Sequence, residues 1–122
     1  MKVQDAMNRE LITVRETDSV MTTLKRLVTG EISGAPVVSE DGRLLGLVTE
    51  FDLLLAIDFV GEQVPVSRVM TSDVVSITPD LDLDKARDLF VRNNWRRLPV
   101  VEGDRVVGIL SRRDILRSHF GL

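Results

Sequence analysis

Apolar residues recur along the chain at two spacings, and each spacing predicts a different kind of element. Residues 11–14 and 74–77 are short apolar runs rich in β-branched side chains, which predict strands. After each run, apolar residues return every three or four positions, as they do on one face of a helix. Candidate N-caps precede these two helices at 18–19 and 80–82. The apolar helical residues are Val20, Leu24, Leu27 and Val28 in the first stretch, and Leu83, Ala86, Leu89 and Phe90 in the second.

Two further strands follow in each half, and each pair is joined by a tight turn. In the first half they are expected at 35–39 and 44–49, around an Asp-Gly pair that suits the positive φ of a hairpin turn. In the second half they are expected at 98–102 and 105–111, around Gly103 and Asp104. A short helix closes each half, from 50 towards 59 and from 112 towards 120. Each half therefore reads strand, helix, strand, strand, helix.

The two halves are copies of one another, displaced by about 63 residues. Because the matches keep their order along a whole half, they indicate a duplication. We predict one repeat over 1–60, a linker over 61–65 and a second repeat over 66–122. The matched positions include Met7 with Met70, Pro36 with Pro99, Gly46 with Gly108, Thr49 with Ser111, and Asp52 with Asp114.

The middle strands predict how the repeats pack. Residues 36–38 and 46–48 are apolar without alternation, so both of their faces should be buried. The helices of one repeat cannot cover both faces, so the other repeat is expected to cover one of them. We therefore predict an α/β (α+β) fold of tandem βαββα repeats, packed as a pseudo-two-fold pair.

Composition removes several function classes. The 122 residues carry a net charge of −3, which is a poor match to nucleic acid or an anionic membrane. The chain has no cysteine, which excludes disulfides and thiolate chemistry. No apolar run approaches the roughly 20 residues of a membrane span. A cytoplasmic protein is the expectation.

The sharpest local motif is Gly-apolar-apolar-Thr/Ser-x-x-Asp, where a strand becomes a helix. It places Thr49 three residues before Asp52, and Ser111 three residues before Asp114. Such a pair predicts a capping box, which satisfies free amides at a helix start. The same groups also suit a nucleotide, because a helix N-terminus attracts phosphate and a carboxylate accepts hydrogen bonds from ribose hydroxyls.

A second motif precedes each Pro-Val-Val strand. In the segment that contains Ser33, Gly34 and Ala35, the small Ser33 and Gly34 would let a flat ring lie against the backbone, or the segment is a simple helix-to-strand turn. Their counterparts are Arg96, Arg97 and Leu98, whose arginines are either solvent-facing charges or phosphate ligands. Trp95, just before them, is expected to fill the core rather than line a site.

Together these motifs resemble the CBS domain, named after cystathionine β-synthase, and their tandem pair resembles a Bateman module. The resemblance runs from Val3 to the last helix. It implies a disc-like pair with two clefts that bind adenosine-containing ligands: AMP, ADP, ATP, NAD or S-adenosylmethionine. It further implies that the carboxylate of one repeat works with the base-binding segment of the other. Applied to this chain, the resemblance implies two ligand sites. One is formed by Thr49 and Asp52 with Val75, Ser76, Ile77, Arg96, Arg97 and Leu98. The other is formed by Ser111 and Asp114 with Ile12, Thr13, Val14, Ser33, Gly34 and Ala35.

The two implied sites differ in charge. Arg112 and Arg113 stand inside the Asp114 motif, whereas Glu50 stands inside the Asp52 motif and would oppose a phosphate. A phosphorylated ligand is therefore expected to prefer the Asp114 site.

No catalytic constellation is visible, because the single histidine, His119, has no second histidine or cysteine to work with. Asp80, Asp82 and Asp84 suit a helix start better than a metal site. We expect a non-enzymatic nucleotide sensor with no obligatory cofactor, which an unknown effector protein reads. Apolar residues on several faces of the closing helices favour a homodimer. The alternatives are a dimerising scaffold without ligand and a nucleic-acid binder that uses the arginine cluster.

Overall fold

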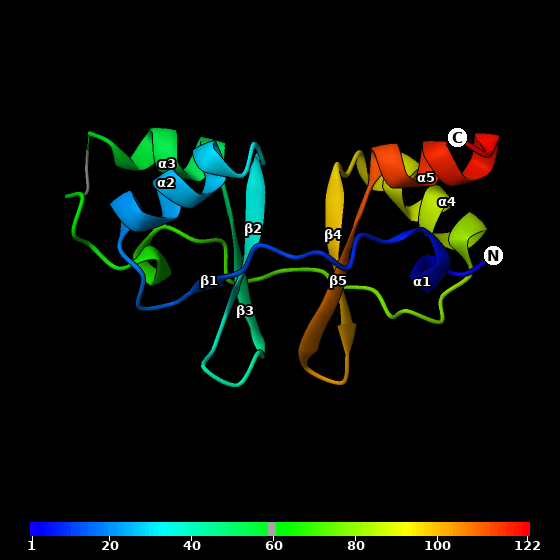
Figure 1. Cartoon of the computed structure of the whole chain (residues 1–122), viewed down its shortest axis with the longest axis horizontal. Helices are drawn as coiled ribbons and strands as arrows, with labels where there is room; N and C mark the ends of the chain where they lie inside the picture. Colours follow the sequence, from blue (N-terminus) through cyan, green and yellow to red (C-terminus); the bar gives the residue numbers. More distant parts are fainter. Residues whose placement is uncertain (59–60) are drawn as a thin grey trace. The chain divides into compact units, whose positions relative to one another are not determined.

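The computed structural model describes residues 1–58 and 61–122, and their contacts divide the chain into two units. Unit 1 consists of Met1–Leu11 together with Val75–Leu122, and unit 2 consists of Ile12–Val74. Helices and small sheets occur in both units, so the fold is mixed α+β, as predicted (Figure 1). No helix within the described ranges is long and apolar enough to cross a bilayer.

Unit 2 contains a three-stranded sheet with helices beside it. Its strands are β1 (Val14–Arg15), β2 (Gly34–Val38) and β3 (Leu44–Thr49), in the order β1-β2-β3. β1 runs parallel to β2, and β2 and β3 form the predicted antiparallel hairpin. The helices are α2 (Val20–Thr29), α3 (Glu50–Ala56) and the short 3₁₀ helix η1 (Val66–Arg68). From β2 the core takes Ala35 and Val37, which are fully buried.

Unit 1 is built from β4 (Arg97–Glu102) and β5 (Arg105–Ser111), which form the second antiparallel hairpin. α4 (Leu83–Asn93) and α5 (Arg112–Phe120) lie beside it, and the N-terminal α1 (Val3–Ala6) joins them, as Figure 1 shows in dark blue. Val3 and Met7 are buried in the same core cluster as Phe90, Leu98 and Ile115. Both hairpin turns use glycines at positive φ, 88° at Gly42 and 68° at Gly103, as the turn chemistry requires.

In each unit a segment from outside the hairpin packs against a glycine of the repeated motif. The segments are Met7–Asn8 in unit 1 and Met70–Thr71 in unit 2. A Cβ at Gly108 would lie 2.5 Å from the sulfur of Met7, and one at Gly46 would lie 2.7 Å from the sulfur of Met70. Backbone pairs accompany these contacts: Asn8 with Ile109 and Thr71 with Leu47 exchange N–H···O bonds of 2.8–3.0 Å. The matched methionines and glycines therefore belong to one packing device that occurs twice.

The first strand of each repeat is shorter than predicted. The strand predicted over 11–14 is displaced: β1 is Val14–Arg15 and overlaps the prediction only at Val14. Of the strand predicted over 74–77, only Ile77 pairs, by a single bridge to Val100. In that bridge Ile77 N–H donates to the Pro99 carbonyl and Val101 N–H donates to the Ile77 carbonyl, at 3.1 and 2.8 Å. The next bond towards the start of this parallel pairing would need a backbone N–H from Pro99, or from Pro36 in the first repeat. Proline has no N–H, so this bond cannot form. The same prolines that mark the middle strands thus end the parallel pairing.

The end of the first repeat involves α3 and residues 61–65. The closing helix of the first repeat was predicted to run towards residue 59; α3 ends at Ala56, and residues 59 and 60 lie outside the described residues. The predicted linker is bound to α2, because Val20 N–H donates to the Val64 carbonyl at 2.8 Å and Met21 N–H to the Glu62 carbonyl at 3.0 Å. Residues 61–65 therefore belong to unit 2 by contact.

Candidate functional site

The Thr49–Asp52 motif forms the predicted capping box at the start of α3. Thr49 N–H donates to Asp52 Oδ2 at 2.9 Å, and Asp52 N–H donates to the Thr49 hydroxyl oxygen at 3.2 Å. The Thr49 hydroxyl lies 3.0 Å from the same carboxylate oxygen. The carboxylate is thus held at the strand-to-helix junction, with Oδ2 occupied by these local bonds.

The Ser111–Asp114 motif repeats this geometry at the start of α5. Ser111 N–H donates to Asp114 Oδ2 at 2.9 Å, and Asp114 N–H donates to the Ser111 hydroxyl oxygen at 3.2 Å. The Asp114 side chain is only 12% exposed, and its Oδ1 lies 3.8 Å from an Arg117 nitrogen. Both capping boxes predicted from sequence are therefore confirmed, and the second has a cation beside it.

Within each unit the structure brings the two predicted motifs together. In unit 2, Gly34 pairs with Thr49, and Glu50 N–H donates to the Ser33 carbonyl at 2.9 Å. The equivalent pairs in unit 1 are Arg97 with Ser111, and Arg112 N–H with the Arg96 carbonyl at 3.1 Å. The start of each middle strand therefore adjoins the helix start that carries the carboxylate. Ala35 and Leu98 turn their side chains into the cores, which leaves only their backbone for a ligand.

The segment before each first strand reaches the same end of its sheet. Val14 pairs with Val37, so Ile12 and Thr13 lead into the sheet beside the start of β2. In unit 1, Ser76 is exposed and immediately precedes Ile77, which pairs with Val100. Each unit thus gathers the three predicted segments at one end of its sheet.

Arg112, which was predicted to bind a phosphate, makes hydrogen bonds within unit 1. Its Nη2 donates to the Asn94 backbone carbonyl at 2.9 Å and to the Asn94 side-chain oxygen at 2.8 Å, and its Nε donates to the Trp95 carbonyl. Arg112 thereby ties the start of α5 to the turn that follows α4. Arg113 and Arg96 are exposed, whereas Arg97 is half-buried.

Trp95 packs where it was expected. Its ring meets Phe90 edge-on, with centroids 6.3 Å apart and planes at 86°, and it lies against the core of unit 1. This T-shaped arrangement is a favourable one for two aromatic rings.

The acidic residues near α4 serve local structure. Asp82 caps α4 by accepting from Asp84 N–H at 3.0 Å, and Asp80 accepts from the Thr78 hydroxyl at 2.7 Å. Among residues 1–58 and 61–122, no group of three or more His, Cys, Asp or Glu could hold a metal ion. His119 is exposed and meets Phe120 edge-on.

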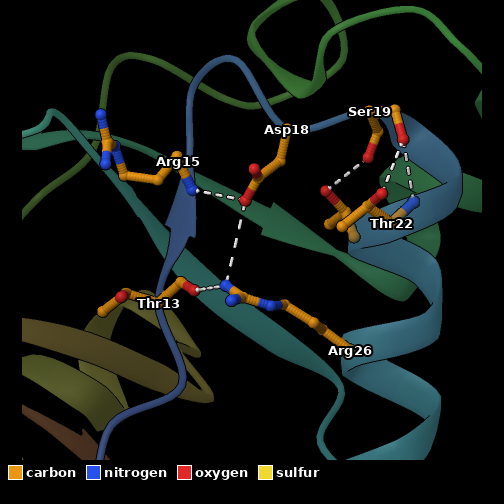
Figure 2. A network of polar contacts seen from close by, with 7 residues as sticks. Thr13, Arg15, Asp18, Ser19, Thr22 and Arg26 are labelled. Carbon is orange, nitrogen blue, oxygen red and sulfur yellow. Dashed lines mark hydrogen bonds and ion pairs between the residues drawn. The ribbon is translucent and has the colours of Figure 1, made fainter.

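Sequence reasoning missed a polar network that holds Thr13, one of the predicted site residues (Figure 2). The Nη1 of Arg26 in α2 donates to the Thr13 carbonyl and lies 3.9 Å from Asp18 Oδ2. The same Asp18 oxygen accepts from Arg15 N–H at 2.9 Å. One signal was present in the sequence: Arg26 and Asp18 align with Leu89 and Leu81 of the second repeat, where the repeats stop matching.

The two units differ strongly in charge. Unit 1 contains eleven lysines and arginines against nine acidic residues, whereas unit 2 contains five against ten. The surroundings of Asp114 are therefore more favourable to an anion than those of Asp52.

Known proteins resemble this chain in sequence and in fold. The family model of the CBS domain matches two segments of the sequence, residues 3–58 and 66–121. The chain is 33% identical over 94% of its length to the uncharacterized protein MJ1225 of Methanocaldococcus jannaschii, of which it spans 41%. It is 32% identical over 93% of its length to the CBS domain-containing protein YhcV of Bacillus subtilis, of which it spans 81%. Among further relatives is an inosine-5'-monophosphate dehydrogenase of M. jannaschii, of which the chain spans 23%.

Solved structures of CBS-domain proteins are also similar to this chain. A CBSX2 structure in complex with AMP matches with a TM-score of 0.88 and 29% identity, covering 98% of this chain and 96% of that one. The CBS domain pair of MJ0100, solved with 5'-methylthioadenosine and S-adenosylmethionine, matches with a TM-score of 0.85 and 30% identity, covering 99% and 97%. The duplicated motif, the paired capping boxes and these matches agree, and the chain belongs to the CBS domain family, with two CBS domains in tandem.

Proposed function

We propose that this protein is a regulatory module that binds an adenosine-containing ligand, with Asp114 or Asp52 as acceptor for the ribose hydroxyls. The observation that carries the proposal is the repeated carboxylate, fixed at a helix start and adjoining an open strand start. A carboxylate held in this way loses little entropy when it accepts the hydroxyls of a sugar. The CBS pairs solved with AMP and with S-adenosylmethionine supply the class of ligand.

The pairing of each carboxylate with the base-binding segment of the other repeat, which the family resemblance implies, stays a prediction. The base-binding part of the present proposal uses the segments that lie beside each carboxylate within its own unit. The backbone around Ile12, Thr13 and Ser33–Ala35 serves in unit 2, and the backbone around Ser76 and Arg96–Leu98 serves in unit 1. Pro36 and Pro99 support this assignment, because neither offers an N–H to the carbonyl groups of the preceding strand. Carbonyls without a ladder donor suit the exocyclic amine of adenine.

A phosphorylated ligand is proposed to prefer Asp114. The positive charge of unit 1 favours an anion, whereas Glu50 beside Asp52 opposes one. Arg112 is engaged with Asn94 and Trp95, so Arg113 is the arginine assigned to the phosphate.

Isothermal titration of the full chain with AMP, 5'-methylthioadenosine, S-adenosylmethionine and GMP tests this proposal. We expect binding of at least one adenosine compound and much weaker binding of GMP. Asp114→Asn should lower AMP affinity about ten- to a hundredfold, since removing a charged acceptor costs roughly 1.5–3 kcal/mol. Asp52→Asn should lower it less.

Asparagine is the informative replacement, because its side-chain oxygen still accepts from Ser111 N–H and preserves the helix cap. Asp84→Asn is the matched control, since this exposed carboxylate lies in the first turn of α4, away from the candidate site. Binding of no adenosine compound, or equal loss in the Asp84 control, would refute the proposal.

A second proposal is that the module forms a homodimer, which could also act as a scaffold without ligand. Phe51, Leu54 and Leu55 of the seven-residue helix α3, and Ile57 directly after it, are each 54–66% exposed. Such a patch is typical of a protein interface. Analytical ultracentrifugation should give a dimer that Leu54→Glu disrupts, and a monomer at all concentrations would contradict this.

In this regulatory role, an effector protein reads the ligand-bound state of the module. Several relatives carry CBS domains within longer enzymes, of which this chain spans a small fraction. The cytoplasmic location stays a prediction from sequence. Nucleic-acid binding is disfavoured because Arg112 and Arg117 have partners within unit 1.

A further inference from the structure

One arginine in α2 reaches across unit 2 to the backbone that precedes β1. The Nη1 of Arg26 donates to the Thr13 carbonyl, and Figure 2 shows the side chain extended from the helix towards that oxygen. A guanidinium bond to a carbonyl is charge-assisted and stronger than a neutral one. Arg26 therefore sets the position of Thr13 relative to α2.

Asp18 closes the network from the other side. Its Oδ2 accepts from Arg15 N–H at 2.9 Å and lies 3.9 Å from Arg26 Nη1. The Arg26 and Asp18 side chains are 49% and 26% exposed, so the pair is partly shielded from solvent. The network thus links both ends of the short strand β1 to one helix.

The Arg26 network holds a segment that lacks a backbone hydrogen bond from β2. Pro36 has no N–H to donate to the segment before Val14, so that segment lacks the ladder bond that would otherwise hold it. Ile12 fits tightly against the end of α2, since a Cβ on Gly30 would lie 2.5 Å from its Cδ1. One side-chain contact and one arginine bond replace the missing pairing.

The second repeat has no residues for the same network. The positions that match Arg26 and Asp18 are Leu89 and Leu81, whose side chains can neither donate nor accept. Val75, which matches Ile12, is 51% exposed. The two base-binding segments of the proposed function are therefore held differently.

We infer that Arg26 is a positioning residue that fixes the Ile12–Val14 backbone in its ligand-binding conformation before the ligand arrives. This inference rests on the proposed function and deepens it. A segment fixed in advance binds without the entropy cost of ordering it. The Ile12–Val14 segment is accordingly fixed before binding by Arg26, whereas the Val75–Ile77 segment is held through Ile77 without a matching arginine.

The test compares Arg26→Leu, which imports the residue of the second repeat, with Arg15→Met. Arg15 enters the network only through its backbone N–H, so Arg15→Met removes a positive charge close by and leaves the network intact. Amide hydrogen exchange and titration with AMP and 5'-methylthioadenosine are measured on each full chain at 25 °C. Circular dichroism checks that every variant is folded at this temperature.

We expect Arg26→Leu to speed exchange across residues 12–15 and leave residues 75–77 unchanged. It should weaken binding of the adenosine compound about fivefold, the effect of losing one hydrogen bond of about 1 kcal/mol. Arg26→Lys keeps a cationic donor and should recover much of the affinity, whereas Arg15→Met should match the wild type. A role in stability alone would lower the unfolding temperature without moving the affinity of the folded protein.

Unchanged exchange in Arg26→Leu would overturn the positioning role, with or without a ligand. Faster exchange at full affinity would overturn its link to binding. Should the wild type bind no adenosine compound, the proposed function fails, and the exchange comparison still decides whether Arg26 positions the segment. If Arg26→Leu does not fold, Arg26→Met replaces it, because methionine keeps an unbranched apolar stem and cannot donate to the Thr13 carbonyl.

Discussion

The glycines of the repeated motif allow a quantitative test of how the units are assembled. A Cβ at Gly46 would lie 2.7 Å from both the Met70 sulfur and the Thr71 carbonyl oxygen. Ordinary contact needs about 0.7 Å more, and the Thr71 oxygen cannot retreat freely because it accepts from Leu47 N–H at 2.8 Å. Gly46→Ala should therefore stretch the two backbone bonds that Thr71 makes with Leu47.

The expected cost combines three terms. Weakening two hydrogen bonds costs about 1 kcal/mol each. Overpacking adds roughly 1–3 kcal/mol, and the lower entropy of the unfolded alanine chain returns about 0.4–1 kcal/mol. The net loss is about 2–5 kcal/mol, which lowers the melting temperature by roughly 8–20 °C at about 4 °C per kcal/mol.

Gly108→Ala should behave differently, because its contact is mainly with a side chain. There the Cβ would lie 2.5 Å from the Met7 sulfur but 3.2 Å from the Asn8 backbone oxygen. Shortening the methionine should thus relieve the Gly108 clash more than the Gly46 clash. Two double-mutant cycles, Gly108→Ala with Met7→Ala and Gly46→Ala with Met70→Ala, measure this by urea denaturation.

Gly61→Ala is the control, because the nearest atom to its Cβ would be Val64 Cγ2 at 3.9 Å. It should change the free energy of unfolding by less than about 0.5 kcal/mol. The reasoning fails if Gly46→Ala is as stable as this control, or if the coupling energy is larger in the Gly46 cycle than in the Gly108 cycle.

Three further changes test local features by thermal and urea unfolding. Glu31 has φ of 53°, so Glu31→Asn should raise stability by about 0.5–1 kcal/mol, and a loss would contradict the left-handed assignment. Arg112→Met should cost about 1–3 kcal/mol because it frees the Asn94 and Trp95 carbonyls, while Arg113→Met should cost almost nothing. Ser111→Ala should cost about 1 kcal/mol as a lost N-cap, and an unchanged melting temperature would refute its capping role.

Local chemistry made much of this protein readable from its sequence. The hairpins follow from Gly42 and Gly103 at the turns, and the capping boxes follow from a hydroxyl and a carboxylate three residues apart. These features depend on bonds between near neighbours, so a short window of sequence contains all of their parts. The duplication then predicted that both repeats would show them.

Tertiary structure decided what depends on residues far apart in the chain. Met1–Leu11 packs with Val75–Leu122 because Met7 fills the space beside Gly108, about a hundred residues away. Arg112 has several possible acceptors, and only the fold brings it to Asn94 and Trp95. The Arg26 bond to Thr13 likewise arises where α2 passes the start of β1. Long side chains choose among partners by proximity, and proximity of distant segments is a property of the folded chain.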